Sequence, residues 1–206
     1  MKRMKRSIIT VLLLLVAATA FAQSKIATIH YDVSLPGEKM DGYIGETSWL
    51  GVGADGRWFV TPDSPIALGI STGWHVFDRE TDGTIVFDNG ALTGTQRRYI
   101  NSVPLMMTAH CYFGDKDRIR LFAGGGIGTY AIIQRFEVGV FAYEKTNWHF
   151  GLYPEIGAQI YLTDMNIDIF LGGRYNYAFE AGESLAGDAK AYDYWTISVG
   201  VAYREW

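Results

Sequence analysis

The stretch from Trp148 to Tyr177 alternates strictly between apolar and other side chains, and this pattern constrains the fold more than any other feature. It divides into two strands joined by a very short turn at 163–165. One face of the pair is apolar and carries Phe150, Leu152, Pro154, Ile156, Ala158, Ile160, Leu162, Ile167, Ile169, Leu171, Gly173 and Tyr175. That face is about ten residues tall, close to the 9–11 residues with which a strand crosses a bilayer. The segment therefore predicts a hairpin that lies against lipid.

The opposite face of this hairpin predicts the inside of a closed barrel. A sheet face in water normally carries Lys, Glu and Thr, because long solvated side chains discourage edge pairing. This face instead carries Gly151, Tyr153, Glu155, Gly157, Gln159 and Tyr161. Small residues fit a narrow interior, where each charge needs a partner. With Asp164 at the centre of the turn, Glu155 lies opposite Arg174, so we expect these two side chains to form an ion pair.

The N-terminus has the layout of a cleaved secretory signal. A basic start at 2–6 precedes an apolar run at 8–18 and the tripeptide Ala20-Phe21-Ala22. We expect cleavage after Ala22, which divides the chain into a signal peptide at 1–22 and one barrel domain at 23–206. Removal of four basic residues changes the formal net charge from −4 to −8. This acidic balance argues against nucleic acid as a partner.

The remaining chain predicts eight strands of similar alternation. They are expected at Lys25–Leu35, Trp49–Val60, Ile66–Phe77, Arg98–Phe113, Arg118–Ala131, 148–162, 167–177 and Tyr192–Arg204. The connections alternate between long (36–48, 78–97, 132–147 and 178–191) and short. No apolar run after the signal is long enough for a membrane helix, so a mature chain that crosses a membrane must do so as a closed barrel. The predicted fold is an all-β, eight-stranded, antiparallel up-and-down transmembrane β-barrel.

The mature chain resembles the small eight-stranded outer-membrane β-barrel family of Gram-negative bacteria, the OmpA/OmpX/OmpW-like proteins. The resemblance is carried by SVPLMMTAHCYFG (Ser102–Gly114), RLFAGGGIGTY (Arg120–Tyr130) and FGLYPEIGAQIYL (Phe150–Leu162). The terminal WTISVGVAYREW is similar to the aromatic-rich last strand that the barrel-assembly machinery recognises, although Trp206 is out of phase with Tyr203. The resemblance implies a location in the outer membrane among lipid and lipopolysaccharide, with both termini periplasmic and the long connections outside the cell.

The first functional hypothesis is a non-enzymatic barrel that acts in envelope integrity or surface interaction. An eight-stranded interior is just wide enough for side chains to fill. The inward charges predicted to fill it, together with Tyr153, are Asp55, Arg57, Arg120, Glu155 and Arg174. Function would then lie in the extracellular loops and in a possible protein partner. In the third long connection, Phe136, Val138 and Val140 continue the alternation, which favours a simple extracellular hairpin; protruding strands that present open edges to extended partners are the alternative.

Three other functions are compatible with the pattern. Inward glycines at 124, 126 and 128 favour a narrow channel for ions or small solutes, if they leave interior space. His30, Asp32 and Ser34 share a face, as a lipid-modifying enzyme would need, but any strand provides this spacing. A soluble lipocalin-like carrier is disfavoured because Lys is nearly absent from strand centres. The acidic loops match no calcium-binding loop, and we expect neither a metal nor a cofactor.

Overall fold

The computed structural model describes residues 24–87, 90–115, 118–163, 166–182 and 191–205. The predicted signal peptide at 1–22 and the centre of the predicted turn at Asp164 lie outside these residues. Within the described residues, no helix has the length and apolar character needed to span a membrane.

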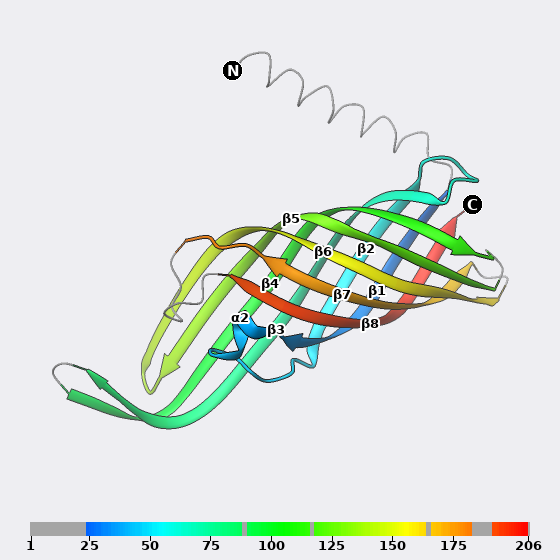
Figure 1. The fold of residues 1–206 in the computed structure, drawn as a ribbon. Coiled ribbons are helices and arrows are strands. Elements are labelled where there is room, and N and C mark those ends of the chain that lie inside the picture. Colours follow the sequence, from blue (N-terminus) through cyan, green and yellow to red (C-terminus); the bar gives the residue numbers. More distant parts are fainter. Residues whose placement is uncertain (1–23, 88–89, 116–117, 164–165, 183–190, 206) are drawn as a thin grey trace, which may run out of the picture.

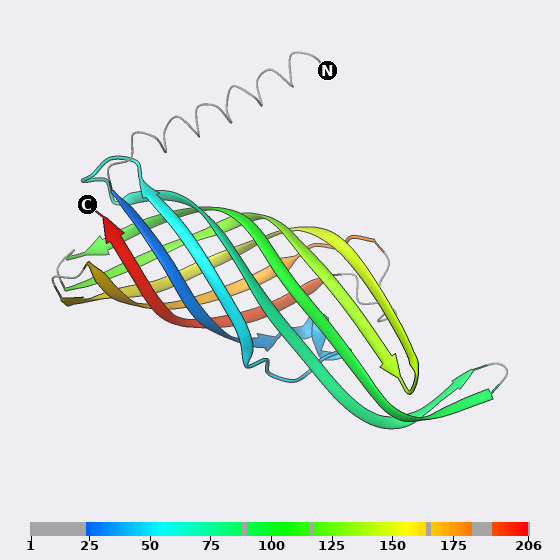
Figure 2. The same cartoon turned by 180° about the vertical axis from the view of Figure 1, so that it is seen from behind.

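Eight antiparallel strands form a closed barrel in which every strand pairs with its neighbours in sequence and the last pairs with the first (Figure 1). The elements are β1 (Lys25–Pro36), α2 (Glu38–Asp41), β2 (Leu50–Phe59), β3 (Ile66–Phe87), β4 (Gly90–Gly114), β5 (Ile119–Val138), β6 (Phe141–Thr163), β7 (Ile167–Ala178) and β8 (Tyr192–Glu205). Seen from behind, β1 to β5 continue the same wall (Figure 2). This topology confirms the predicted up-and-down barrel.

The alternation in the sequence becomes an alternation between the outside and the lumen. Ile29 and Ile156 are each 70% exposed, whereas the adjacent His30 and Glu155 are 2% and 1% exposed. Successive strand residues point to opposite faces of a sheet, so one phase covers the outside with apolar side chains and the other fills the inside. The lipid-facing hairpin predicted at Trp148–Tyr177 therefore corresponds to the membrane-spanning parts of β6 and β7.

The two ends of the barrel differ, as the alternating connection lengths predict. One end, which we call the turn end, carries both ends of the described chain and the short connections between strands (Figure 1). Gly114 and Asn166 adopt φ of 98° and 58° there, the left-handed conformation that tight turns favour in Gly and Asn. The opposite end, the loop end, carries α2 and two long hairpins.

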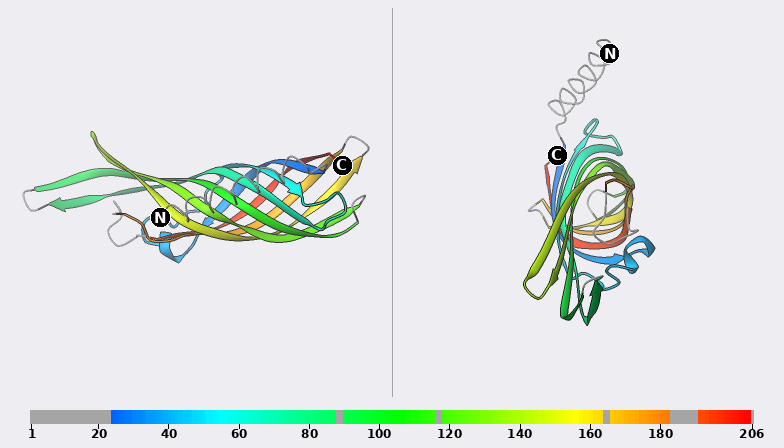
Figure 3. Two further views of the ribbon diagram at one scale, coloured as in Figure 1. Left: turned by 90° about the horizontal axis from the view of Figure 1, so that it is seen from above. Right: turned by 90° about the vertical axis from the view of Figure 1, so that its left-hand side faces the viewer.

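Two predicted loops are strands, which corrects the sequence analysis. Residues 78–87, 90–97 and most of 132–147 extend β3, β4, β5 and β6 beyond the barrel. We call this extension the projecting sheet, defined as residues 77–87, 90–101, 132–138 and 141–149. Figure 3 shows its two hairpins reaching past the rest of the loop end. Polar side chains lie on both faces here, so the apolar alternation that identifies a membrane strand is lost although the ladder continues.

The first long connection covers the mouth of the barrel at the loop end. Its short helix α2 is followed by Tyr43 and Ile44, which are buried together with Met40. These side chains pack in one cluster with Phe77 and Ile100 from the strand walls. The loop is therefore part of the packed interior and closes the lumen at this end.

Candidate functional site

Two arginines and two carboxylates meet at the centre of the lumen. Glu155 on β6 accepts hydrogen bonds from Arg57 Nη2 at 3.2 and 3.1 Å and from Arg174 Nε at 3.0 Å. Asp55 accepts from the same two guanidinium groups at 3.2 and 2.7 Å. The β6–β7 register places Glu155 opposite Arg174, which confirms that predicted pair. All four side chains are buried, and charge-assisted pairing of this kind offsets the cost of removing them from water.

A second buried group is centred on Asp32. Its Oδ1 lies 2.7 Å from His30 Nδ1, and its Oδ2 lies 3.0 Å from His75 Nε2. Ser198 donates a third hydrogen bond to Asp32 at 2.5 Å. His30 Nε2 is 3.5 Å from Asp55 Oδ2, so this group is continuous with the arginine cluster. The whole network crosses the lumen between β1, β2, β3, β6, β7 and β8.

Further polar side chains extend the network in both directions along the barrel. Toward the loop end, His75 contacts the hydroxyl of Tyr194 at 3.1 Å, and that hydroxyl lies 3.0 Å from Ser102. Toward the turn end, Arg57 donates to the hydroxyl of Tyr112 at 3.0 Å. His110 Nε2 lies 2.5 Å from Glu155. Buried polar side chains therefore occupy the middle of the lumen from wall to wall.

Arg120 lies apart from the other four predicted lumen charges. Its guanidinium group is 4.5 Å from the ring centres of both Phe59 and Tyr112, nearer the turn end. Arg204 and Asp168 form a further ion pair at 3.5 Å, and both are buried. The structure thus gathers Asp55, Arg57, Glu155 and Arg174 into one cluster and places Arg120 in a neighbouring aromatic layer.

Apolar layers close the lumen on both sides of the polar network. Near the turn end, one cluster comprises Ile26, Phe59, Ala67, Tyr112, Phe122, Phe170 and Ala202. Near the loop end, the other comprises Met40, Tyr43, Ile44, Phe77, Ile100, Met106, Tyr130, Ile132, Tyr153, Ala178, Tyr192 and Tyr194. A solute crossing the barrel would have to displace both layers and the charged centre between them.

The inward glycines make room for rings. A Cβ added at Gly126 would lie 2.8 Å from the Tyr153 ring. At Gly53 and Gly157, an added Cβ would collide with the rings of His30 and Phe122. The expectation that such glycines leave space for solutes is therefore wrong at these positions, because large side chains from neighbouring strands occupy that space.

The histidine network and the α2 loop are the functional features that the sequence analysis missed. The alternation places His30 and Asp32 on one face of β1, but their meeting with His75 of β3 depends on how three strands curve around the lumen. The enzyme hypothesis is based on His30, Asp32 and Ser34, and in the structure all three side chains are buried. Within the described ranges, no group of three or more His, Cys, Asp or Glu side chains could hold a metal ion.

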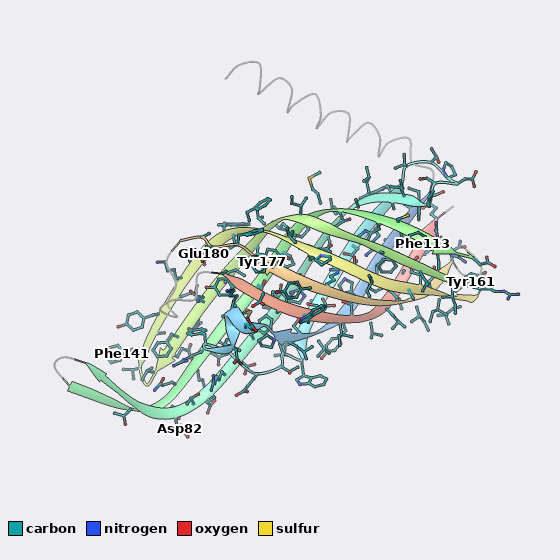
Figure 4. The ribbon with its side chains drawn as sticks, in the orientation of Figure 1. Asp82, Phe113, Phe141, Tyr161, Tyr177 and Glu180 are labelled. Atoms are coloured by element: carbon teal, nitrogen blue, oxygen red, sulfur yellow. The ribbon has the colours of Figure 1, made fainter. Side chains whose placement is uncertain are left out.

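Among the described residues, two edges of the projecting sheet have no neighbouring strand. Pairing between β2 and β3 ends at Val76, so residues 77–87 of β3 pair only with β4. Pairing between β6 and β7 begins at Gly151, so residues 141–149 of β6 pair only with β5. Figure 4 labels Asp82 and Phe141 on these two segments. Phe136 and Val138 belong to β5, whereas Val140 lies in the turn and is 93% exposed.

Comparisons with known proteins agree with this architecture. Residues 8–204 match the family described as outer membrane protein beta-barrel domain. No curated protein matches the chain by sequence. Among solved structures, Ail, the attachment invasion locus protein of Yersinia pestis, is 15% identical with a TM-score of 0.51, over 88% of this chain and 98% of Ail. This likeness supports the barrel fold.

Other solved outer-membrane barrels resemble the chain to a similar extent. The N-terminal β-barrel domain of Pseudomonas aeruginosa OprF is 13% identical with a TM-score of 0.49, over 88% of this chain and 96% of that domain. Neisserial surface protein A is 12% identical with a TM-score of 0.48, over 87% of this chain and 94% of that protein. Ail has also been solved in complex with the heparin analogue sucrose octasulfate.

Proposed function

This chain belongs to the outer membrane protein beta-barrel domain family, and on that premise we propose that it is a non-enzymatic scaffold with a closed lumen. Its activity, in surface interaction or envelope integrity, then resides in the parts that leave the membrane. The observation that carries this proposal is the filled lumen, in which two apolar layers enclose a buried charge network around Glu155. A scaffold of this kind needs neither a cofactor nor a metal.

The proposed orientation places the turn end in the periplasm and the loop end outside the cell. Short periplasmic turns and longer extracellular connections are typical of bacterial barrels, and the barrel has this asymmetry. The N-terminal 22 residues are then the cleaved signal peptide, and the last strand is the segment that the barrel-assembly machinery recognises. Outer-membrane lipid and lipopolysaccharide surround the exposed apolar side chains of the barrel.

The projecting sheet is the proposed interaction surface. Its open edges at 77–87 and 141–149 present backbone groups that can pair with an extended partner segment. Ail, which shares the barrel fold, has been crystallised with a heparin analogue, so ligand binding has a precedent on this architecture. A narrow channel is the second candidate, but no observation favours it, because rings fill the space beside the inward glycines.

A trimmed hairpin tests the proposal. Replacing residues 81–96 by a two-residue Asn-Gly turn between Glu80 and Arg97 keeps their 2.8 Å ion pair while removing the outer part of the β3–β4 hairpin. We expect the variant to fold, as judged by heat-modifiable migration, because the barrel pairing is untouched. In a strain lacking the protein, the full chain should restore surface adhesion or detergent resistance and the trimmed chain should not.

The matched control keeps the full length of the β3–β4 hairpin and carries a single substitution on its exposed side. Thr95→Ala removes a 2.8 Å hydrogen bond to Asp82 and should behave as the full chain. Full restoration of both phenotypes by the trimmed chain would contradict a role for this hairpin. The absence of any adhesion or detergent phenotype in the deletion strain would contradict the proposed function itself.

A further inference from the structure

The projecting sheet separates its charges between two faces. Residues directly opposite one another on paired strands share a face, so Arg79, Arg98, Phe136 and Tyr143 form one row on the inner face. Among the described side chains on that inner face, the ionisable residues are Arg79, Arg98, Lys145, Tyr143 and His149, with no carboxylate. The outer face carries Asp78, Glu80, Asp82, Glu137 and Glu144 with Arg97 and Arg135. A positive inner face is unusual in a chain whose net charge is negative.

The two cations in the inner row lie directly opposite each other. Arg79 on β3 pairs in register with Arg98 on β4, and like charges at such positions destabilise a sheet. The outer face shows the usual arrangement, since Arg97 pairs with Glu80 at 2.8 Å and Arg135 pairs with Glu137 at 2.5 Å. Within the described residues, no carboxylate forms an ion pair with Arg79 or Arg98. No ion pair among the described residues therefore offsets the repulsion between these two arginines.

Hydrogen-bond donors beside the pair also have no acceptor. The guanidinium group of Arg98 lies between two rings, 5.2 Å from the centre of Tyr43 and 5.9 Å from that of Phe136. Its Nε and the Tyr43 hydroxyl are both buried without a hydrogen-bond partner among the described residues. Tyr43 itself is 6% exposed. Burial raises the pKa of Tyr43, against the opposing effect of Arg98, so its hydroxyl stays a neutral donor.

We propose that Arg79 and Arg98, with the Tyr43 hydroxyl, bind sulfate or phosphate ester groups of an anionic polysaccharide that approaches from outside the cell. Guanidinium groups form paired hydrogen bonds with the oxygens of such esters, and a bound anion removes the repulsion between the two arginines. The rings of Phe136 and Tyr143 continue the same row and provide flat apolar surfaces for the sugar faces; Tyr143 is 59% exposed. The inference rests on the proposed function, because the site can meet such a polysaccharide only if the loop end faces the medium outside the cell.

The test titrates the mature protein, refolded in phosphatidylcholine nanodiscs, with dextran sulfate and with uncharged dextran of equal length. We expect dextran sulfate to bind with an affinity that falls as salt is added, and uncharged dextran not to bind. Arg79→Gln and Arg98→Gln should each weaken binding about tenfold, the effect expected for loss of a charged hydrogen-bonding group. Tyr43→Phe, which removes only the hydroxyl, should weaken binding by a smaller factor.

Arg97→Gln is the matched control, because this residue neighbours Arg98 on the same strand but points to the outer face. It should leave the affinity for dextran sulfate within about twofold of the unaltered chain, since surface substitutions away from a site have small effects. Each variant is accepted only if it shows heat-modifiable migration. Since both Gln variants relieve a like-charge pair, we expect them to fold at least as well as the unaltered chain.

Three results would overturn the inference. The first is no binding of dextran sulfate, and the second is equal loss of binding in Arg97→Gln and Arg98→Gln. The third is binding of purified lipopolysaccharide that depends on Arg79 and Arg98 while dextran sulfate is not bound, which would assign the site to phosphates of the membrane itself. These outcomes leave the proposed scaffold function intact. A deletion strain without any adhesion or detergent phenotype would instead contradict that function and not the anion site.

Discussion

At the scale of single residues, Glu155 holds the centre of the lumen together. It contacts Arg57, Arg174 and His110 at 2.5–3.2 Å and is 1% exposed. Breaking a buried ion pair by removing one partner leaves an uncompensated buried charge, which is far more costly than losing a pair at the surface. In this protein, the loss of the Glu155 charge would leave Asp55 as the one carboxylate of the cluster that pairs with both Arg57 and Arg174.

Glu155→Gln is therefore expected to lower the free energy of unfolding by about 3 kcal/mol. Urea unfolding of the barrel in lipid vesicles, followed by tryptophan fluorescence, would measure this loss. Glu144→Gln, on the exposed outer face of the projecting sheet, is the matched control and should change the free energy by about 0.5 kcal/mol or less. Equal effects of the two substitutions would show that the lumen network does not stabilise the barrel.

At the scale of elements, glycines on one strand position rings from the next. Gly53 on β2 lies opposite His30 on β1, and an added Cβ would collide with the imidazole that hydrogen-bonds Asp32. By contrast, nothing lies within 4 Å of a Cβ built at Gly173 on β7. The same residue type thus has different constraints on the two faces of one sheet.

Gly53→Ala should destabilise the barrel by about 2 kcal/mol, because overpacking forces His30 away from Asp32. Gly173→Ala adds a methyl group to open space and should leave stability unchanged or slightly raised. Thermal unfolding monitored by the shift in electrophoretic migration distinguishes the two variants. If both substitutions had the same effect, the collision with His30 would not be the cause.

The membrane strands could be predicted from the sequence, whereas the projecting sheet is indicated there only by the alternation at Phe136, Val138 and Val140. Inside the bilayer, residues such as Ile156 and Glu155 must alternate because one face meets lipid and the other meets the lumen. Beyond the bilayer both faces meet water, so residues 78–87 and 90–97 lose the alternation while keeping the ladder of paired strands. The pairing of Glu155 with Arg174 could be predicted because the short turn between β6 and β7 fixes the register of these strands. The contact between Arg57 and Glu155, on strands that are not neighbours in the sheet, and the burial of Met40 depend on barrel closure, which local pattern does not encode.

At the scale of the whole molecule, the structure combines a filled barrel with a sheet that projects beyond it. The middle of its lumen is occupied by charged and polar side chains, and apolar layers lie on both sides of them. The strands that build the lumen wall continue without interruption into the projecting sheet (Figure 3). The filled barrel and the Arg79–Arg98 row therefore belong to one continuous set of strands.

Single-channel recording of the refolded mature protein in a planar bilayer tests the closed lumen most directly. The unaltered chain and the Glu155→Ala, Arg174→Ala double variant are compared, with heat-modifiable migration as proof of folding. We expect no discrete openings from either protein, because both apolar layers remain in place when the central pair is removed. Discrete openings of the unaltered chain that grow larger in the double variant would contradict the closed lumen and identify a narrow channel.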